Sequence, residues 1–213
     1  MNSELLKAII IGDYSNPDYH PLNNIEGSLK EILSDKVNLT FTEDRASFNY
    51  ERLSEFNFCI LYVDSFGKKL SSAQITGLLT YVLKGGGLLV IHNGISYQDN
   101  AEFAQLVGAK FINHPPYQKL TYKSQGVVNP ILAGIEDFEM EEELYIFEFD
   151  NFSNHEVLLY ASNAEMTIPA AWLKNYGEGR VVYLSPGHDV NSFSNSTFRQ
   201  LIVNCAKYAA MTK

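Results

Sequence analysis

The chain has 213 residues, of which 46% are hydrophobic and 19% are charged, and its formal net charge is −9. These values exclude general disorder and predict one domain over residues 1–213, which the order of its expected elements makes an α/β domain. The acidic balance argues against a nucleic-acid partner, which requires Lys and Arg clusters. The longest apolar run, around residues 88–91, is too short to cross a membrane, and the first residues lack the basic segment of a signal peptide. We therefore expect a cytoplasmic protein with no membrane partner.

The first half of the chain alternates strands and helices. Apolar runs predict buried strands, and apolar residues at helical spacing predict helices, the last of which Gly85 ends. The expected elements are a strand at 7–11, a helix at 22–34, a strand at 37–42, a short helix at 50–55, a strand at 58–63, a helix from 71–72 and a strand at 88–91. This order is typical of a doubly wound, mostly parallel sheet with helices on both faces, as in flavodoxin-like folds.

The second half carries additional strands. A short helix is expected at 102–107, and an amphipathic helix at 197–210 closes the chain. Strands are expected at 119–123, 144–149, 157–161, 170–173 and 181–184, with a tight turn at 175–179.

The chain contains two cysteines, Cys59 and Cys205. Cys59 lies inside an apolar run and Cys205 inside the last expected helix, so both are predicted to be small buried side chains without a disulfide. Free cysteines agree with a cytoplasmic location.

Four of the five histidines lie next to proline or glycine in expected loops. His92 follows the run 88–91, at the carboxyl end of a strand, where open parallel sheets collect their chemistry. His20 precedes Pro21, His114 precedes two prolines, and His188 follows Pro186-Gly187. Any one of them alone is more often structural, but together they predict a shared cleft at one edge of the sheet. His155 is read as an exposed loop residue.

Imidazoles in such a cleft can transfer protons or bind a metal. We expect His92 and His188 to be a central catalytic pair and Glu143 to orient them, although Glu141–Glu143 also reads as a solvated charge run. The set His20, His92, His114 and His188 also suits zinc or another divalent ion, but no H-x-x-H or H-E-x-x-H spacing supports it, so a metal is left open. Further ligand-binding candidates are His20, His114, Asp13, Tyr14, Asn93 and Trp172, the last of which also reads as a core residue.

Six segments in order carry a resemblance to a known family. They are Thr42-Glu43-Asp44, Gly85 to His92, Leu106 to Pro115, Glu142 to Tyr145, Pro169 to Trp172, and Tyr176 to His188. The chain resembles the trehalose-utilisation (ThuA-like) family, whose fold is similar to class I glutamine amidotransferases. It departs from the family at Val90-Ile91-His92-Asn93-Gly94, where Gly-Ile-His-Ala-Ala is usual, and at Glu142-Glu143, where Asp-Glu is usual.

The resemblance implies a small polar ligand, a sugar or sugar derivative, and acid–base, hydrolytic or isomerising chemistry. His92 stands where amidotransferases place their nucleophilic cysteine, so glutamine hydrolysis by a thiol is not expected. The alternative is a non-catalytic carbohydrate-sensing or interaction protein that kept the fold and lost the nucleophile. A homo-oligomer is left open.

Overall fold

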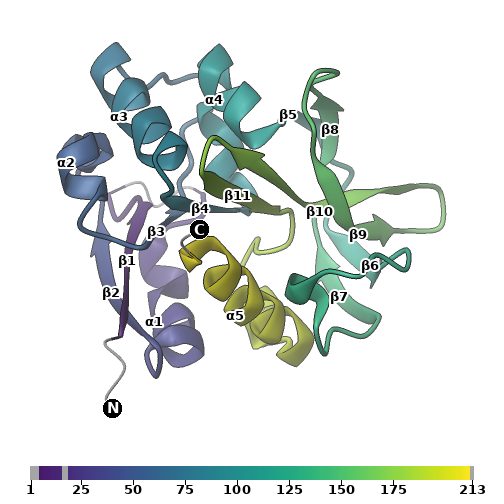
Figure 1. Cartoon of the computed structure of the whole chain (residues 1–213). Coiled ribbons are helices and arrows are strands. Elements are labelled where there is room, and N and C mark those ends of the chain that lie inside the picture. Colours follow the sequence, from purple (N-terminus) through teal and green to yellow (C-terminus); the bar gives the residue numbers. More distant parts are fainter. Residues whose placement is uncertain (1–4, 16–18, 212–213) are drawn as a thin grey trace.

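The computed structural model describes residues 5–15 and 19–211, and a nine-stranded sheet runs through its centre in the order β2-β1-β3-β4-β11-β10-β9-β6-β7 (Figure 1). Its strands are β1 (Leu6–Gly12), β2 (Val37–Thr42), β3 (Phe58–Tyr62), β4 (Gly87–Ile91), β6 (Gln118–Lys123), β7 (Phe138–Glu142), β9 (Glu156–Ser162), β10 (Thr167–Tyr176) and β11 (Gly179–Leu184). The strands from β2 to β11 in this order pair in parallel, and the pairings from β11 to β7 are antiparallel. The predicted α/β fold with extra strands in the second half is confirmed.

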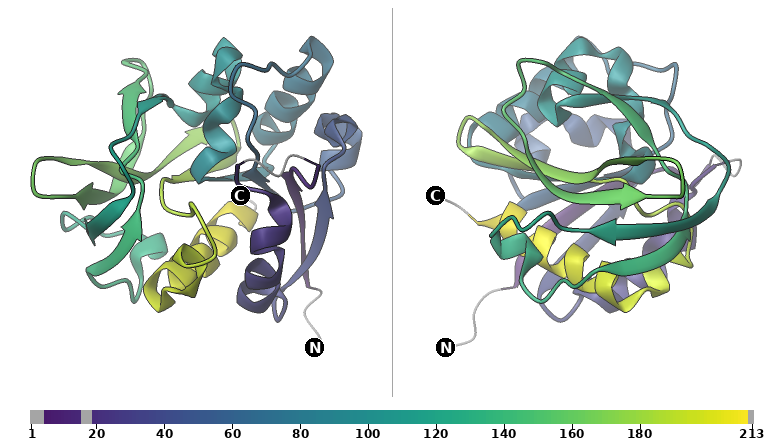
Figure 2. Two further views of the ribbon diagram at one scale, coloured as in Figure 1. Left: turned by 180° about the vertical axis from the view of Figure 1, so that it is seen from behind. Right: turned by 90° about the vertical axis from the view of Figure 1, so that its right-hand side faces the viewer.

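Helices cover both faces of the parallel half. Figures 1 and 2 show α1 and α5 on one face and α2, α3 and α4 on the other. The helices are α1 (Leu22–Leu33), α2 (Tyr50–Leu53), α3 (Ser72–Leu83), α4 (Ala101–Val107) and α5 (Ser196–Ala210). In the described part of the chain, no helix combines the length and apolarity needed to span a bilayer.

Side chains of the parallel strands alternate between two cores. On β1, Ala8 and Ile10 belong to the core that α1 and α5 cover, whereas Ile9 and Ile11 belong to the core that α3 and α4 cover. Because both faces of the inner strands β3 and β4 are buried, each of them reads as an unbroken apolar run, whereas the edge strand β2 alternates apolar and polar residues. That run is the signal by which the sequence pattern located them.

Two strands are not predicted by the sequence pattern. β5 (Ala109–Asn113) pairs antiparallel with β8 (Ile146–Phe149) in a separate two-stranded sheet, and Ala109 is its one buried residue, so no apolar run marks it. β7 contains three glutamates and reads as a charge run, although its first and last residues are buried. The strand expected at 144–149 begins only at Ile146.

Both cysteines are fully buried, as predicted, and burial raises the pKa of each thiol far above its ordinary value. A thiol that is neither exposed nor ionised cannot serve as a nucleophile. Cys59→Ala and Cys205→Ala are each expected to lower the free energy of unfolding by about 1 kcal/mol. Chemical denaturation measures that change, and both variants are expected to keep any ligand binding and activity of the wild type; loss of that activity in a folded Cys59→Ala protein would contradict the exclusion of thiol chemistry.

Candidate functional site

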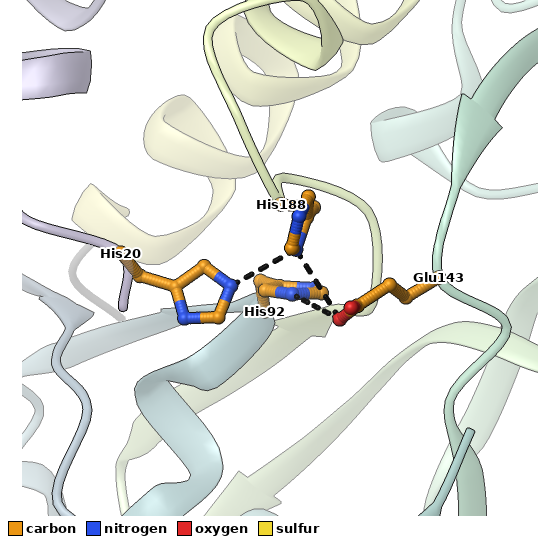
Figure 3. A group of neighbouring side chains, drawn as sticks. All are labelled: His20, His92, Glu143 and His188. Carbon is orange, nitrogen blue, oxygen red and sulfur yellow. Dashed lines mark hydrogen bonds and ion pairs between the residues drawn. The ribbon is translucent and has the colours of Figure 1, made fainter. Parts of the chain in front are cut away.

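Four side chains from distant segments meet at the carboxyl edge of the parallel strands (Figure 3). His20 lies in the loop after β1, His92 directly follows β4, Glu143 directly follows β7, and His188 lies in the loop after β11. Each residue offers one donor atom, and these atoms all lie within 4.8 Å of one another. Of the four histidines expected to share a cleft, the structure brings His20, His92 and His188 together, with 5.5 Å between the ring centroids of His92 and His188, whereas His114 lies outside this group.

The backbone is strained at two of these residues. His20 and His92 each have a φ of 48°, and among the described residues they are the non-glycine residues with positive φ. At His92 the chain turns sharply from β4 into the 3₁₀ helix η2 (His92–Asp99). Gly94 belongs to this turn, and a Cβ there would meet the carbonyl oxygen of Leu61 at 2.3 Å. Such strain costs on the order of 1–3 kcal/mol per residue and concentrates at functional sites.

Hydrogen bonds fix the orientation of the buried His92 ring. Its Nδ1 lies 2.6 Å from the carbonyl oxygen of Ser185, and because a carbonyl only accepts, Nδ1 carries the proton. Nε2 therefore presents a lone pair, which faces Glu143 Oε2 at 3.4 Å and has no hydrogen-bond partner among the residues that the structure describes. The ring of Tyr145 packs against His92 at 4.2 Å between centroids and closes this side of the site.

His20 is oriented in the same way by a carboxylate. Its Nδ1 donates to Asp64 Oδ2 at 3.2 Å, and its Nε2 faces His188 Nδ1 at 3.0 Å. Burial lowers the pKa of His20, the facing imidazoles of His92 and His188 lower it further, and Asp64 opposes both without reversing the shift. Asp64 is itself held through its backbone N–H, which donates to Asp13 Oδ2 at 3.2 Å.

Glu143 and His188 form an ion pair, with 3.2 Å between Oε2 and Nδ1. Burial raises the pKa of Glu143, but its contacts with His188 and His92 outweigh burial and hold that pKa well below its usual range. Burial lowers the pKa of His188, but Glu143 and the nearby carboxylates outweigh it, so this pKa is raised. The exposed fractions of the two side chains, 13% for Glu143 and 28% for His188, leave the pair open to solvent on one side.

The neighbouring residues Glu142 and Glu143 have different roles. Glu142 is fully buried and accepts hydrogen bonds from the backbone N–H groups of Gly187 and His188, at 2.6 and 3.0 Å, and from the hydroxyl of Ser192. It thus anchors the loop that carries His188. Successive side chains at a strand end point to opposite sides, so Glu143 faces the histidines. The sequence analysis singled out both residues, but it could not say which one faces the site.

Three other candidates lie outside the group of four. The side chain of His114 is 35% exposed. Its Nδ1 lies 2.9 Å from the carbonyl oxygen of the next residue, Pro115, and 3.7 Å from Glu143 Oε1. Asp13 pairs with Arg45 and lines a neighbouring cavity of about 420 Å³. Tyr14 is exposed, and its hydroxyl donates to Glu26.

The last two candidates, Asn93 and Trp172, are buried. Asn93 is fully buried, and within residues 5–15 and 19–211 neither its side-chain nitrogen nor its oxygen has a hydrogen-bond partner. Trp172 requires a correction: it is fully buried, its indole N–H donates to the carbonyl oxygen of Val107 at 2.8 Å, and its ring stacks on Tyr183. A ring packed in this way has no free face for a ligand, so Trp172 is a core residue. His155, read as an exposed loop residue, is instead partly buried and stacks on Phe149.

Several residues around the cluster were not among the predicted site residues. Tyr145 belongs to the Glu142–Tyr145 segment, but a lone tyrosine gives no sign of stacking on a histidine. Ser185 acts through its backbone carbonyl, which no residue type reveals. Tyr117 lies 5.3 Å from His188 between ring centroids and is 39% exposed. The only feature of the sequence that could have indicated Tyr117 as a site residue is its position directly after Pro115-Pro116.

Comparison with known proteins is consistent with this fold and its order of segments. A family model described as trehalose utilisation (ThuA) matches residues 14–209. A protein described as ThuA-like from Bacteroides uniformis ATCC 8492 has a TM-score of 0.83 at 21% identity, over 98% of this chain and 93% of that one. A second, from Parabacteroides merdae ATCC 43184, has a TM-score of 0.82 at 18% identity, over 98% and 91%.

A third similar structure is described as a cytoplasmic protein from Salmonella typhimurium LT2. Its TM-score is 0.73 at 12% identity, over 98% of this chain and 100% of that one. Identities this low compare the fold alone. No curated protein matches the chain.

Proposed function

The chain belongs to the trehalose-utilisation (ThuA) family, and from this premise we propose that it is an enzyme that binds a sugar or sugar derivative at the histidine cluster and converts it by acid–base or hydrolytic chemistry. Membership of the family supports a sugar-related role. The observation that carries the finer proposal is the convergence of three imidazoles and one carboxylate, from four segments, on one point. The Salmonella neighbour's description agrees with a cytoplasmic location, which we also propose.

Hydrolysis and isomerisation of a sugar both require that one group removes a proton and another supplies one. Glu143 and His188 are a matched pair for this task, because the carboxylate accepts a proton while the imidazolium donates one. His114 stands on the solvent side of Glu143 and can exchange protons with it. The buried cysteines leave acid–base chemistry, rather than attack by a thiolate, as the reaction type that these residues support.

Partly exposed aromatic rings beside the cluster suit the apolar faces of a sugar ring. Tyr117 lies next to His188, and Phe66 lies 5.3 Å from Phe111, which in turn lies 5.9 Å from His114, all between ring centroids. Ligand sites combine aromatic surfaces of this kind with a few polar groups that fix orientation. We therefore assign Tyr117 to sugar binding.

Tyr117→Ala is expected to weaken sugar binding by about 5-fold, because a stacking contact worth about 1 kcal/mol is lost. The side chain is 39% exposed, so folding stability is expected to stay unchanged. Calorimetric titration with trehalose and a panel of disaccharides measures the effect. Phe152→Ala is the matched control, since Phe152 is an aromatic residue that is 96% exposed. Equal affinities of the Tyr117→Ala and wild-type proteins would refute this assignment.

The proposed function is tested by incubating the protein with trehalose and the same panel and following the products by NMR. Conversion of at least one sugar, lost when the cluster is altered, supports the proposal. Absence of both binding and conversion across the panel overturns it.

The non-catalytic alternative predicts a different outcome, namely sugar binding with no product. The strained backbone at His92 and the partnerless Nε2 of its buried ring favour the enzyme. A sensor would bind a sugar through hydrogen bonds and stacking alone and would have no need to keep either feature.

A further inference from the structure

We propose that His20, His92, His188 and Glu143 together bind one divalent transition-metal ion, for which Zn²⁺ is the best match. This inference deepens the proposed function, since the ion would lie in the same site. It nevertheless stands on its own observations, which are the spacing of the donor atoms, the protons available to them and the groups that hold them.

The spacing of the donor atoms fits a metal site. The three measured separations are 3.0 Å for His20 Nε2 to His188 Nδ1, 3.2 Å for His188 Nδ1 to Glu143 Oε2, and 3.4 Å for His92 Nε2 to Glu143 Oε2. Ligands bound to zinc at 2.0–2.1 Å in a tetrahedron are separated by about 3.3 Å. Every other pair of these donor atoms also lies within 4.8 Å.

The protons at the site are too few for a network of hydrogen bonds. The Nδ1 protons of His20 and His92 are donated outward, to Asp64 and to Ser185, so both Nε2 atoms point inward as lone pairs. Glu143 Oε2 is a further acceptor. Among the described residues, the one proton that faces these acceptors is on His188 Nδ1. It can be donated to His20 Nε2 or to Glu143 Oε2, and in either case His92 Nε2 has no donor. A cation at the centre satisfies all of these donor atoms at once.

The groups behind the donors have the arrangement of a metal site. Histidine ligands almost always donate their second ring N–H to a carboxylate or a backbone carbonyl, which fixes the tautomer and the ring orientation. Asp64 does this for His20, and the Ser185 carbonyl does it for His92. Glu142 holds the backbone of His188 in place. Since these holding groups come from other segments, the donors are positioned before any ion arrives.

The ligand set differs from the one suggested by the sequence. His114 is replaced by Glu143, because His114 lies outside the group of four and its Nδ1 lies 2.9 Å from its own Pro115 carbonyl oxygen. Three imidazole nitrogens and one carboxylate oxygen favour zinc or a similar transition metal, whereas Mg²⁺ and Ca²⁺ prefer oxygen ligands alone. A bound ion of this kind would supply Lewis-acid polarisation of a sugar oxygen. Because the ion would occupy Glu143 Oε2 and His188 Nδ1, proton transfer in the metal-loaded protein would pass to Glu143 Oε1 and to His114, which lies 3.7 Å from it.

Metal stoichiometry measured without sugar tests this inference. The full chain is stripped with a chelator, dialysed against Zn²⁺, and analysed for bound metal. We expect about one zinc per wild-type chain. Each of the variants His20→Ala, His188→Ala and Glu143→Gln is expected to weaken zinc binding by at least about 100-fold, since loss of an outer-shell partner alone costs 10–100-fold.

The matched controls are His155→Ala and Glu141→Gln, a histidine and a glutamate outside the cluster, which are expected to bind zinc as the wild type does. Circular dichroism checks that each variant is folded. If an alanine variant does not fold, Glu143→Gln still provides the test, because glutamine keeps the shape of the glutamate side chain. Wild-type protein that retains no zinc, or folded cluster variants with unchanged affinity, would overturn the inference. A protein that binds zinc but converts no sugar contradicts the proposed function alone, and one that converts sugar but retains no zinc contradicts this inference alone.

Discussion

Glu143→Gln is expected to lower the turnover of the sugar by about 10²–10⁴-fold, the range typical of a lost acid–base group. This corresponds to about 2.7–5.5 kcal/mol of transition-state stabilisation. Glutamine fills the same space but carries no charge, so the ion pair with His188 is lost and the negative charge that faces His92 is removed. Steady-state kinetics on the sugar that the wild type converts measures the loss.

The residues next to Glu143 separate this effect from a general structural one. Glu141→Gln changes the same functional group on an exposed side chain, and its turnover is expected to match the wild type. Glu142→Gln weakens the bonds that hold the His188 loop, so it is expected to lower both stability and turnover. Turnover of Glu143→Gln within about twofold of the wild type would show that Glu143 takes no part in the chemistry.

Saturation with Zn²⁺ is expected to raise the thermal midpoint of unfolding by about 8–16 °C. An ion present at 1,000 times its dissociation constant stabilises the native state by about 4 kcal/mol, and a chain of this length gains about 2–4 °C per kcal/mol. The direction follows from binding to the folded chain alone, because the unfolded chain does not bring His20, His92, His188 and Glu143 together. Differential scanning calorimetry before and after chelation measures the shift.

His20→Ala removes one proposed donor and is expected to abolish this zinc-dependent shift. Metal-free His155→Ala is expected to have a lower thermal midpoint than the metal-free wild type, because the stacking of the His155 ring on Phe149 is lost. Zn²⁺ is nevertheless expected to raise the midpoint of this variant by the full amount. An equal shift in the two variants would place the ion elsewhere, and no shift in the wild type would contradict zinc binding to the folded chain.

The sequence was most informative about the parallel half of the sheet. There, unbroken apolar runs marked strands buried on both faces, such as the run that ends at His92. The rule that parallel strands direct their carboxyl ends to one edge then brought His20, His92 and His188 together, although they are far apart in the chain. Local pattern and topology were sufficient for these three residues.

The fourth member of the cluster depended on information that the sequence pattern does not contain. Glu143 reaches the histidines because β7 ends at Glu142, and β7 is held at the edge of the sheet by antiparallel pairing to β6, which in turn pairs with β9. With no apolar run to mark β7, neither its end nor the side to which each glutamate points could be predicted. The interpretation of Trp172 as a ligand-binding residue was wrong for a related reason. The hydrogen-bond acceptor of its indole N–H is the carbonyl oxygen of Val107, which is near only once α4 has packed against the sheet.

The central claim is that the sugar binds at the histidine cluster, and a crystal structure of Glu143→Gln soaked with the sugar that the wild type converts tests it most directly. The slow variant holds the sugar unconverted. The account predicts sugar oxygens within about 3 Å of His188, and a sugar ring against Tyr117. Sugar found instead in the cavity of about 330 Å³ beside Tyr50 and Lys84, with none at the histidines, would contradict it.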